Sequence, residues 1–540
     1  MNGEDAFLDV AGSDTALWSR VQQLDPGVIR FPGGTVANVY HPSTPGYGLV
    51  LSEIQQFQGE LASHVEDSYQ VEQQKIANGS LTQNYAAQMI ALANGTGVKV
   101  LYCTNILTGS VAETVQVLQL LDSAGVEVVG VELGNEAYLH DYDAVYPDVQ
   151  AYINAALPYN NAIKAAYPGM KVALAAAPPV ILNNEDAVQA AFVQAWNSPL
   201  STVSWLDAAV LHAYPELSIP CAQTTVTANI ACALPLAAEF AGTRMDSALA
   251  ELQDVTAHDI WVTEWNVRGP YLNYGNSLIQ ALFCGEMFVT FARHPHVKIV
   301  TLHNFLTSDE GYNVLRKKEG EPFTPMADFR ALQALASLFR GSNIDQPTTI
   351  TGSSGVVAFA FAEPYQLKQD LLLVNHGGTA FSLSGLQAGA SPGHAWVVGG
   401  TDASVGTTPN EMSNAAGLSL QSLDLPDIHV LYVPSYSIAL VEWTSDQLYA
   451  IDELPSVAPM LITPNPAQDE VLLRYSSLRA GQVSVDVVDA TGQFVASPMT
   501  GMISSGEHEL VIHCEGWAPG VYMIRLSGVD GSRPLRLLKL

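Results

Sequence analysis

Two glutamates each stand directly after an apolar run of strand character. The run at 128–133 leads into Gly-Asn-Glu at Glu136, and the run that begins at residue 259 ends in Glu264. A carboxylate at the end of a buried strand must be paired or must face an open site. Two such carboxylates about 5–5.5 Å apart are the acid/base and the nucleophile of a retaining glycosidase. The sequence therefore predicts hydrolysis of a glycosidic bond, with Glu136 as acid/base and Glu264 as nucleophile.

Further polar and aromatic residues follow neighbouring apolar runs, where a substrate would lie. Polar side chains fix a ligand's orientation, and aromatic faces stack on sugar rings. Arg30, His212 and Tyr214 would also supply the donors that keep a nucleophile ionised. Structural roles are the alternative, since Glu136 could cap a helix, Glu264 could form a rim salt bridge, and Arg30 could serve a scaffold ion pair. The residues that we expect to bind substrate are Arg30, Asn38, Asn105, Asn135, Tyr138, His212, Tyr214, Trp265, His303 and Asn304.

Strand-like runs alternate with helical patterns from the start of the chain to about residue 340. Seven runs are clear, and an eighth strand would come from 7–10 or from residues upstream. This pattern predicts an α/β fold, a (β/α)8 TIM barrel, whose catalytic residues lie at the C-terminal ends of the strands. An open doubly wound sheet is the competing fold, but no G-x-G-x-x-G follows a strand.

The helical patterns disappear after the barrel. Short alternating runs broken by Gly, Ser and Pro predict a β-sandwich at 343–448. Prolines mark a linker at 449–459, and the runs at 460–540 predict a small all-β domain. We therefore expect a catalytic barrel at 1–342 and two β domains after it.

The composition restricts the partners. With 22 Lys and Arg against 53 Asp and Glu, the net charge is -31. Such a surface repels nucleic acid and anionic membranes but not a neutral glycan. No stretch is apolar and long enough to be a transmembrane segment. The first residues, MNGEDAFLDVAG, lack the basic and apolar regions of a signal peptide.

The chain has five cysteines, and their spacing fits no zinc or redox motif. We therefore expect neither a metal nor another cofactor. Cys221 and Cys232 bracket a short loop, which favours a disulfide in an oxidising compartment. Cys103 and Cys284 stand in apolar surroundings and are expected to be buried thiols.

Four short motifs occur in the order found in clan A glycoside hydrolases. They are Arg-Phe-Pro-Gly-Gly at 30–34, Gly-Asn-Glu at 134–136, His-Ala-Tyr at 212–214 and Thr-Glu-Trp-Asn at 263–266. The first looks most like the α-L-arabinofuranosidase family, which also includes some endoglucanases. The resemblance covers roughly residues 20–310.

The resemblance implies roles for individual residues. Glu136 would be the acid/base and Glu264 the nucleophile, with Arg30 and Asn135 assisting. Thr263 stands where the arabinofuranosidases usually have Asp, and its motif looks closer to β-xylosidase and glucuronidase relatives in the clan. The sugar, the linkage and the choice between endo and exo cleavage stay open.

The C-terminal stretch resembles a different family. Thr-Pro-Asn-Pro-Ala at 463–467, Val-Asp-Val-Val-Asp-Ala-Thr-Gly at 485–492 and Ala-Pro-Gly-Val-Tyr at 518–522 look like the sorting domain of the Bacteroidetes type IX secretion system. This implies that the secretion machinery is a partner. The chain would cross the outer membrane and be released or held at the cell surface.

Two functions from different classes fit these patterns. The favoured one is a secreted retaining glycoside hydrolase that cleaves a plant or algal polysaccharide or oligosaccharide. The alternative is a non-catalytic surface glycan-binding protein with an inert barrel. Such a protein would need the aromatic rim but neither glutamate.

Overall fold

The computed structural model describes most of the chain in two units. It describes residues 1–4, 6–57, 60–182, 187–215, 217, 221, 226–267, 277–307, 313–336, 338, 343–346, 356–362, 368–383, 392–400, 418–444, 461–477, 481–489, 493–504, 506–528 and 531–540. The two compact units are Met1–Asp446 and Gln447–Leu540. The expected linker at 449–459 lies outside the described residues, and the domain boundaries stay predictions.

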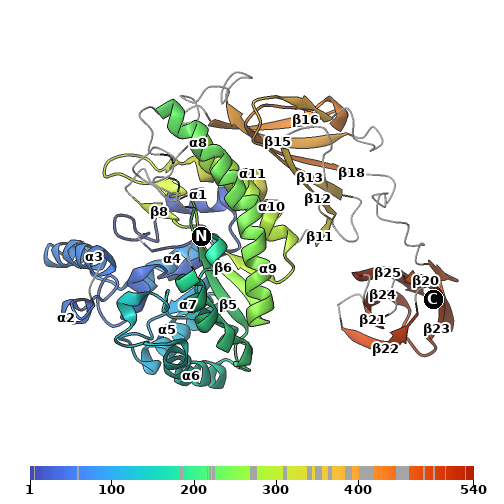
Figure 1. Cartoon of the computed structure of the whole chain (residues 1–540), viewed down its shortest axis with the longest axis horizontal. Coiled ribbons are helices and arrows are strands. Elements are labelled where there is room, and N and C mark those ends of the chain that lie inside the picture. The colour runs from blue at the N-terminus through green and yellow to red at the C-terminus, as the bar shows by residue number, and fades with distance from the viewer. Residues whose placement is uncertain are drawn as a thin grey trace. The chain divides into compact units, whose positions relative to one another are not determined.

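A parallel sheet with the strand order β1-β2-β3-β4-β5-β6-β7 forms the centre of the first unit (Figure 1). Its strands are β1 Val28–Phe31, β2 Lys99–Thr104, β3 Val128–Leu133, β4 Val172–Ala175, β5 Ala208–Ala213, β6 Asp259–Trp265 and β7 Val297–Val300. Every pair of neighbours is also consecutive in the chain, which is the arrangement of β/α repeats. The expected (β/α)8 barrel is confirmed as the fold.

Helices connect the strands and surround the sheet. They are α1 Thr15–Leu24, α2 Leu51–Ile54, α3 Glu60–Ala77, α4 Tyr85–Thr96, α5 Val111–Ser123, α6 Val149–Ala166, α7 Ala187–Asn197, α8 Val226–Glu239, α9 Met245–Thr256, α10 Leu278–Arg293 and α11 Ala327–Leu335. Short turns of helix, η1 Thr35–Val39, η2 His140–Tyr142 and η3 Val180–Leu182, follow β1, β3 and β4 on the rim. The segments after β1 and β3 carry Asn38, Asn135, Glu136 and Tyr138 of the candidate site.

The first residues of the chain lie between the two ends of the sheet. Asn2 forms a parallel bridge with Arg30 of β1. Its N–H donates to the carbonyl oxygen of Leu302, just after β7, at 2.8 Å. Residues 1–3 therefore occupy the C-terminal half of the eighth strand position. The expectation that 7–10 would do so is wrong, because those residues form turns and bends.

Packing explains why 7–10 leaves the sheet. The ring of Phe7 lies 6.3 Å from that of Phe31 and 6.0 Å from that of Tyr85, so the apolar run covers β1 and α4 from outside. The N-terminal half of the eighth position is a cavity of about 380 Å³. It is lined by Met1, Leu24, Asp25, Pro26, Gly27, Val28, Val129, Trp265, Phe288, Lys298, Ile299, Val300, Leu302 and Leu332.

One tryptophan closes the barrel interior from below. Trp261 of β6 packs with Leu101, Ala173 and Ala208 of three other strands. A Cβ added to Gly130 of β3 would lie 2.4 Å from Cη2 of Trp261, so the glycine makes room for the indole ring. The polar residues at the C-terminal ends of the strands therefore lie above a packed cluster of apolar side chains.

The register between β5 and β6 shifts at the predicted nucleophile. Leu211 pairs with Val262, but His212 pairs with Glu264, so Thr263 is an extra residue in β6. Bulges of this kind re-aim side chains and are common next to active sites.

A six-stranded sheet packs on the outside of the barrel (Figure 1). Its order is β11-β12-β13-β18-β15-β16, from β11 Asn343–Gln346, β12 Val356–Ala362, β13 Lys368–Asn375, β18 Ser437–Thr444, β15 Gly393–Gly400 and β16 Leu418–Leu425. One face packs on α10 and α11, where a Cβ on Gly285 would lie 3.0 Å from Ile438. The other face packs on the pair β14 Phe381–Ser382 and β17 Tyr432–Val433 through a second apolar core. The expected β-sandwich after the barrel is confirmed.

The second unit is all β, as expected. It has two sheets, β19-β20-β23 and β22-β21-β24-β25, around its own apolar core. The strands are β19 Leu461–Thr463, β20 Glu470–Ser477, β21 Gly481–Asp489, β22 Phe494–Ile503, β23 Gly506–His513, β24 Gly520–Gly528 and β25 Gly531–Lys539. Phe494 and Met502 of β22 are exposed.

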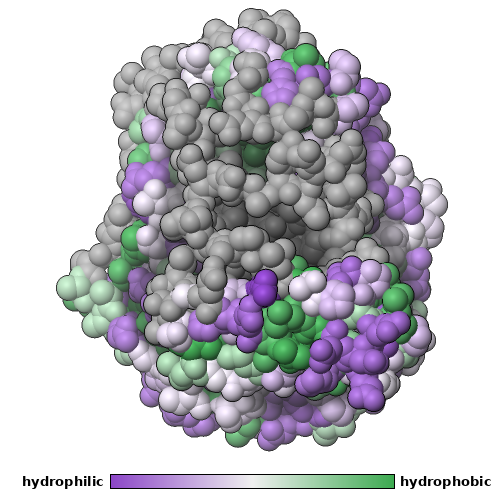
Figure 2. All heavy atoms as spheres, turned by 90° about the vertical axis from the view of Figure 1, so that its right-hand side faces the viewer, coloured by the Kyte–Doolittle hydropathy of each residue, from purple (hydrophilic) through white to green (hydrophobic). Residues whose placement is uncertain are grey.

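Figure 2 shows hydrophobic patches between hydrophilic residues on one face of the molecule.

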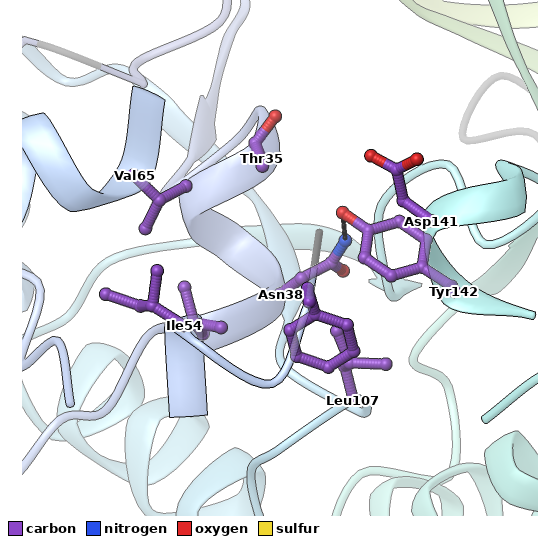
Figure 3. A pocket seen from close by; sticks show the side chains of 9 residues that line it. Thr35, Asn38, Ile54, Val65, Leu107, Asp141 and Tyr142 are labelled. Carbon is purple, nitrogen blue, oxygen red and sulfur yellow. Dashed lines mark hydrogen bonds between the residues drawn. The ribbon is translucent and has the colours of Figure 1, made fainter. Parts of the chain in front are cut away.

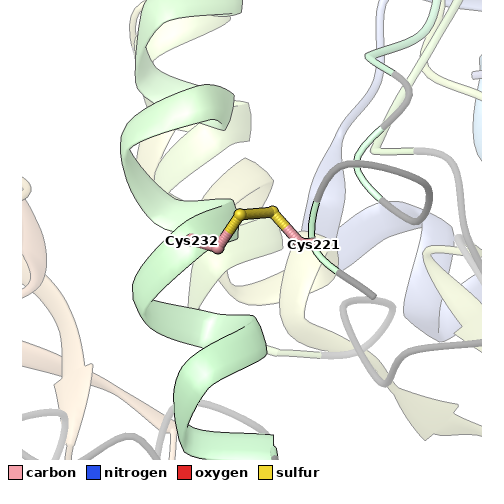
Figure 4. The surroundings of a disulfide bond; sticks show 2 residues. All are labelled: Cys221 and Cys232. Carbon is pink, nitrogen blue, oxygen red and sulfur yellow. A yellow bond between two sulfur atoms is a disulfide. The ribbon is translucent and has the colours of Figure 1, made fainter. Parts of the chain in front are cut away.

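Cys221 and Cys232 form the expected disulfide, with Cα atoms 5.5 Å apart (Figure 4). The bond ties the segment after β5 to α8. Cys103, Cys284 and Cys514 are free and buried. Among the described residues, the helices are too short or too polar to cross a membrane.

Candidate active site

The two predicted catalytic glutamates lie side by side at the C-terminal rim of the barrel. One ligand atom each of Glu136, His212 and Glu264 lies within 4.8 Å of the other two. Nδ1 of His212 lies 2.8 Å from Oε1 of Glu136 and 3.7 Å from Oε2 of Glu264. A distance of at most 4.8 Å between carboxylate oxygens of Glu136 and Glu264 is typical of retaining glycosidases. Inverting enzymes hold their carboxyls about 6.5–9.5 Å apart.

Arg30 connects the site to the barrel interior. The guanidinium is completely buried and donates from Nη1 to Oε1 of Glu264 at 2.6 Å. Its Nε donates to Oε2 of Glu132 at 2.7 Å, and Nη2 donates to Oδ1 of Asn135 at 2.8 Å. Charge-assisted bonds of this length are strong and directional. Arg30 therefore fixes the orientation of Glu264 and Asn135 together.

Glu264 is held as a carboxylate. Burial by itself raises its pKa, but the positive charges of His212 and Arg30 and the hydrogen bond from Tyr214 outweigh burial and lower the pKa well below its usual value. The Tyr214 hydroxyl donates to Oε2 at 2.9 Å. An ionised carboxylate with fixed geometry is what a nucleophile requires.

The backbone around Glu136 is unusual. Glu136 has φ +46°, in the left-handed region, and Gly134 has φ +87°. A non-glycine residue there costs about 1–2 kcal/mol. The Asn38 side chain clamps the turn, because its Nδ2 donates to Asn135 O and its Oδ1 accepts from Asn135 N, both at 2.8 Å. Strain that is held in place by neighbours is typical of functional sites.

Two groups hold the side chain of Glu136. Tyr138 donates from its hydroxyl to Oε1 at 3.0 Å, and His212 lies 2.8 Å from the same oxygen. Nε2 of His212 lies 3.2 Å from Oγ1 of Thr263, the bulge residue. Burial lowers the pKa of His212, but Glu264 and Glu136 outweigh burial and raise it above its usual value.

His303 lies behind Glu264. Its Nδ1 is 2.9 Å from Nδ2 of Asn2 and 3.8 Å from Oε2 of Glu264, and its ring packs edge-on against Tyr214. Burial lowers its pKa to about 4, which favours a neutral imidazole at neutral pH. Its Nε2 lies 3.8 Å from Oε2 of Glu4.

Three of the expected substrate-binding amides hold the backbone in this structure. Asn38 bonds Asn135 and the Tyr142 hydroxyl. Asn105 accepts from the N–H groups of residues 107 and 108 and donates to Tyr40 O at 3.2 Å. Oδ1 of Asn304 accepts from the N–H of the next residue at 2.7 Å. Their role here is to shape the loops around the site.

Trp265 does not face the site, so the stacking role expected for it is not supported by its position. Its indole is completely buried, and its ring lies 5.4 Å from that of Phe288 and 5.2 Å from that of Phe291 in α10. Successive side chains of a strand point to opposite faces. Since Glu264 points to the rim, Trp265 points into the helix layer.

Two buried carboxylates near the site were not among the predicted site residues. Glu132 lies four residues before Glu136 in the chain and accepts a hydrogen bond from Arg30. A second acid in the same apolar run was a signal for it. Glu4 accepts from the N–H of Thr35 at 2.8 Å and lies beside His303. A Cβ on Gly34 would lie 1.9 Å from its carboxyl carbon, so the Gly-Gly pair at 33–34 gives this acid its space.

Glu136, His212 and Glu264 are also the group among the described residues whose donor atoms could approach one metal ion. The same atoms already have partners. Nδ1 of His212 contacts Glu136, and Glu264 accepts from Arg30 and Tyr214. The arrangement therefore suits proton exchange and a fixed carboxylate better than metal ligation.

A cavity of about 300 Å³ opens on the Glu136 side of the site. Its described lining comes from the segments that follow β3, β4 and β5. The lining residues are Glu136, Tyr138, Leu139, His140, Ala177, Pro178, Leu182, Gln189, Phe192, His212, Ala213 and Tyr214.

A smaller pocket is lined in part by Asn38 and Tyr142, whose side chains are hydrogen-bonded to each other (Figure 3). Ile54, Val65 and Leu107 are among its apolar lining residues, and Figure 3 shows Thr35 and Asp141 in the upper part of the view. At about 20 Å³ it holds no more than a water molecule or two.

Solved structures with a similar fold include α-L-arabinofuranosidases. A family 51 α-L-arabinofuranosidase from Bifidobacterium longum aligns with a TM-score of 0.55 and 13% identity, over 82% of this chain and 94% of its own. The GH51 arabinofuranosidase from Xanthomonas axonopodis pv. citri gives 0.53 and 12%, over 79% and 89%. The chain shares their fold. The clan A resemblance indicated by the motifs is thereby confirmed as a matter of fold.

The C-terminal residues have their own match. Residues 461–536 match the family model of the secretion system C-terminal sorting domain. The expected sorting domain is confirmed, and it directs the chain to the cell surface or the extracellular space. No curated protein matches the sequence.

Proposed function

We propose that this chain is a secreted retaining glycoside hydrolase with Glu264 as nucleophile and Glu136 as acid/base. One observation carries the proposal: the two carboxylates approach within 4.8 Å on either side of His212. The ionised state of Glu264 and the strained backbone of Glu136 add to it.

In the first step, Oε2 or Oε1 of Glu264 attacks the anomeric carbon of the sugar. The bond from that carbon to the leaving oxygen breaks, and Glu136 gives its proton to this oxygen, so an alcohol leaves. The sugar is then an ester of Glu264. Tyr138 and His212 both hold Oε1 of Glu136, and among the described residues Oε2 is the oxygen that faces no such partner.

In the second step, water attacks the same carbon. Its proton passes to Glu136, the ester bond to Glu264 breaks, and the carboxylate is restored. The net reaction adds one water across one glycosidic bond. Asn135, held by Arg30 at 2.8 Å and by Asn38, would bond the sugar hydroxyl next to the anomeric carbon.

We expect a plant or algal oligosaccharide or polysaccharide as the substrate. α-L-Arabinofuranosides come first, because both proteins of similar fold named above are arabinofuranosidases. β-D-Xylosides and β-D-glucuronides come next, because of the Thr-Glu-Trp-Asn motif at 263–266.

The test uses p-nitrophenyl glycosides of these sugars with wild type, Glu264→Gln and Glu136→Gln. Wild type should release p-nitrophenol from at least one, and Glu264→Gln should lose at least about 10³-fold in kcat. Glu251→Gln, an exposed glutamate of α9, is the matched control and should keep wild-type rates.

The alternative of a non-catalytic glycan-binding protein gives a different result. Wild type would then bind oligosaccharides and hydrolyse none of the glycosides. Equal hydrolysis by wild type and Glu264→Gln would contradict the assigned nucleophile.

A further inference from the structure

Among the described residues, Glu136 is the one of the two proposed catalytic glutamates that lines the cavity of about 300 Å³. Its described lining includes Glu136, His212 and Tyr214 but neither Glu264 nor Arg30. In a retaining enzyme the transferred sugar contacts both carboxylates, whereas the leaving group contacts the acid alone. A group in this cavity would therefore be on the leaving side.

The cavity wall combines aromatic and polar side chains. Phe192 of α7 lies 5.5 Å from the His140 ring and 6.0 Å from the Trp196 ring, so its orientation is fixed from two sides. Tyr138 packs edge-on against the same Trp196. Gln189, one helical turn before Phe192, also lines the cavity.

This combination fits a sugar ring. The C–H faces of a sugar stack on aromatic rings, while its hydroxyls need donors and acceptors such as an imidazole and a carboxamide. The volume lies at the lower end of the roughly 300–1,000 Å³ typical of ligand sites.

We infer that this cavity is a saccharide-binding subsite for the leaving group, with Phe192 as its stacking platform and Gln189 as a polar contact. The inference rests on the proposed function and extends it. The enzyme cleaves between two sugars, and the second sugar is recognised.

The second step of the reaction, in which the ester bond to Glu264 breaks, offers the sharpest test. A sugar hydroxyl in the subsite attacks the anomeric carbon of the Glu264 ester, its proton passes to Glu136, and the ester bond breaks. The product is a transferred glycoside instead of the hydrolysed sugar. The ratio of transfer to hydrolysis reports on the subsite only, because both products come from the same ester.

The experiment uses the p-nitrophenyl glycoside that wild type cleaves fastest, with xylobiose, cellobiose, arabinobiose or methanol as acceptor. At least one disaccharide should give transfer product. Phe192→Ala and Gln189→Ala should each lower its transfer ratio about three- to tenfold. The methanol ratio should not change, because methanol needs no platform.

Tyr167→Ala is the matched control. Tyr167 follows α6 and precedes β4, at the opposite end of the barrel, and is half-buried like Phe192. It should keep the wild-type ratio. Melting temperatures of all variants exclude a loss of the fold. An unchanged disaccharide ratio in both subsite variants overturns the inference, as does transfer to methanol alone.

The outcome differs if the proposed function itself fails. Wild type then releases no p-nitrophenol from any donor. A measurement of disaccharide binding then tests whether the cavity is a sugar site. Saturation-transfer NMR signals from a disaccharide that disappear in Phe192→Ala would support a sugar site without catalysis. The absence of such signals in wild type overturns the inference.

Discussion

Nη1 of Arg30 donates a hydrogen bond of 2.6 Å to Oε1 of Glu264. The same guanidinium contacts Glu132 at 2.7 Å from below, so one buried cation lies between two buried carboxylates. Removing one partner of such a group leaves an uncompensated charge in the interior. Glu264, the proposed nucleophile, is thus part of a buried charge network that links β1, β3 and β6.

Replacing Arg30 by lysine tests this network. Lysine keeps the charge but cannot contact Glu132, Glu264 and Asn135 at once, because it lacks the planar fork. We expect kcat/KM to fall roughly 100-fold, equivalent to about 2.7 kcal/mol. Steady-state kinetics on the best p-nitrophenyl glycoside would measure this. Arg20→Lys, at a half-buried position of α1, should behave as wild type. Equal rates for both variants would contradict the account.

Tyr214→Phe should change the pH profile. The hydroxyl stabilises the charged form of Glu264, so its loss raises the pKa of that carboxyl. Because the nucleophile must be ionised, the acidic limb of kcat/KM should move to higher pH in the variant. The maximal rate should fall roughly tenfold or more, as expected for a charge-assisted bond. An acidic limb at the wild-type pH would show that Tyr214 does not act on the nucleophile.

Gly130→Ala tests the packing below the site. The added methyl would lie 2.4 Å from Trp261, in a filled interior. Overpacking of this kind costs about 1–3 kcal/mol. Thermal unfolding should occur at a lower temperature than in wild type. Gly169→Ala is the control, because nothing lies within 4 Å of a Cβ there. Equal melting temperatures for the two variants would contradict the assigned packing.

The disulfide is expected to matter for stability and not for chemistry. Cys221→Ala combined with Cys232→Ala should lower the free energy of unfolding by roughly 2–4 kcal/mol. Neither cysteine is among the described residues that line the cavity at Glu136, so kcat should stay within about twofold of wild type. Denaturant unfolding and steady-state kinetics measure the two effects. A large loss of kcat in a folded double variant would mean that the segment after β5 shapes the site.

The polar residues at the ends of apolar runs could be predicted from the sequence. A polar side chain at such a position must be paired or must face an open site. Glu136, Glu264, Arg30 and His212 do meet at one rim. Trp265 was misjudged for a related reason. Because Trp265 is next to Glu264 in the chain, its side chain was expected to face the same site. In a strand, however, neighbouring side chains point to opposite faces.

The remaining features depend on long-range pairing that local patterns do not encode. The bulge at Thr263 appears only when β6 is aligned with β5. The eighth position is filled by Asn2, through bonds to residues that are distant in sequence. The contact of Glu4 with His303 depends on that closure.

Trapping the covalent intermediate tests the central claim most directly. A 2-deoxy-2-fluoro glycoside with a good leaving group, of the sugar that wild type prefers, slows the second step more than the first. Mass spectrometry of the digested protein should then find the sugar on the peptide that contains Glu264, and Glu136→Gln should not move the label. A label on any other residue, or turnover without a covalent sugar, would contradict the account.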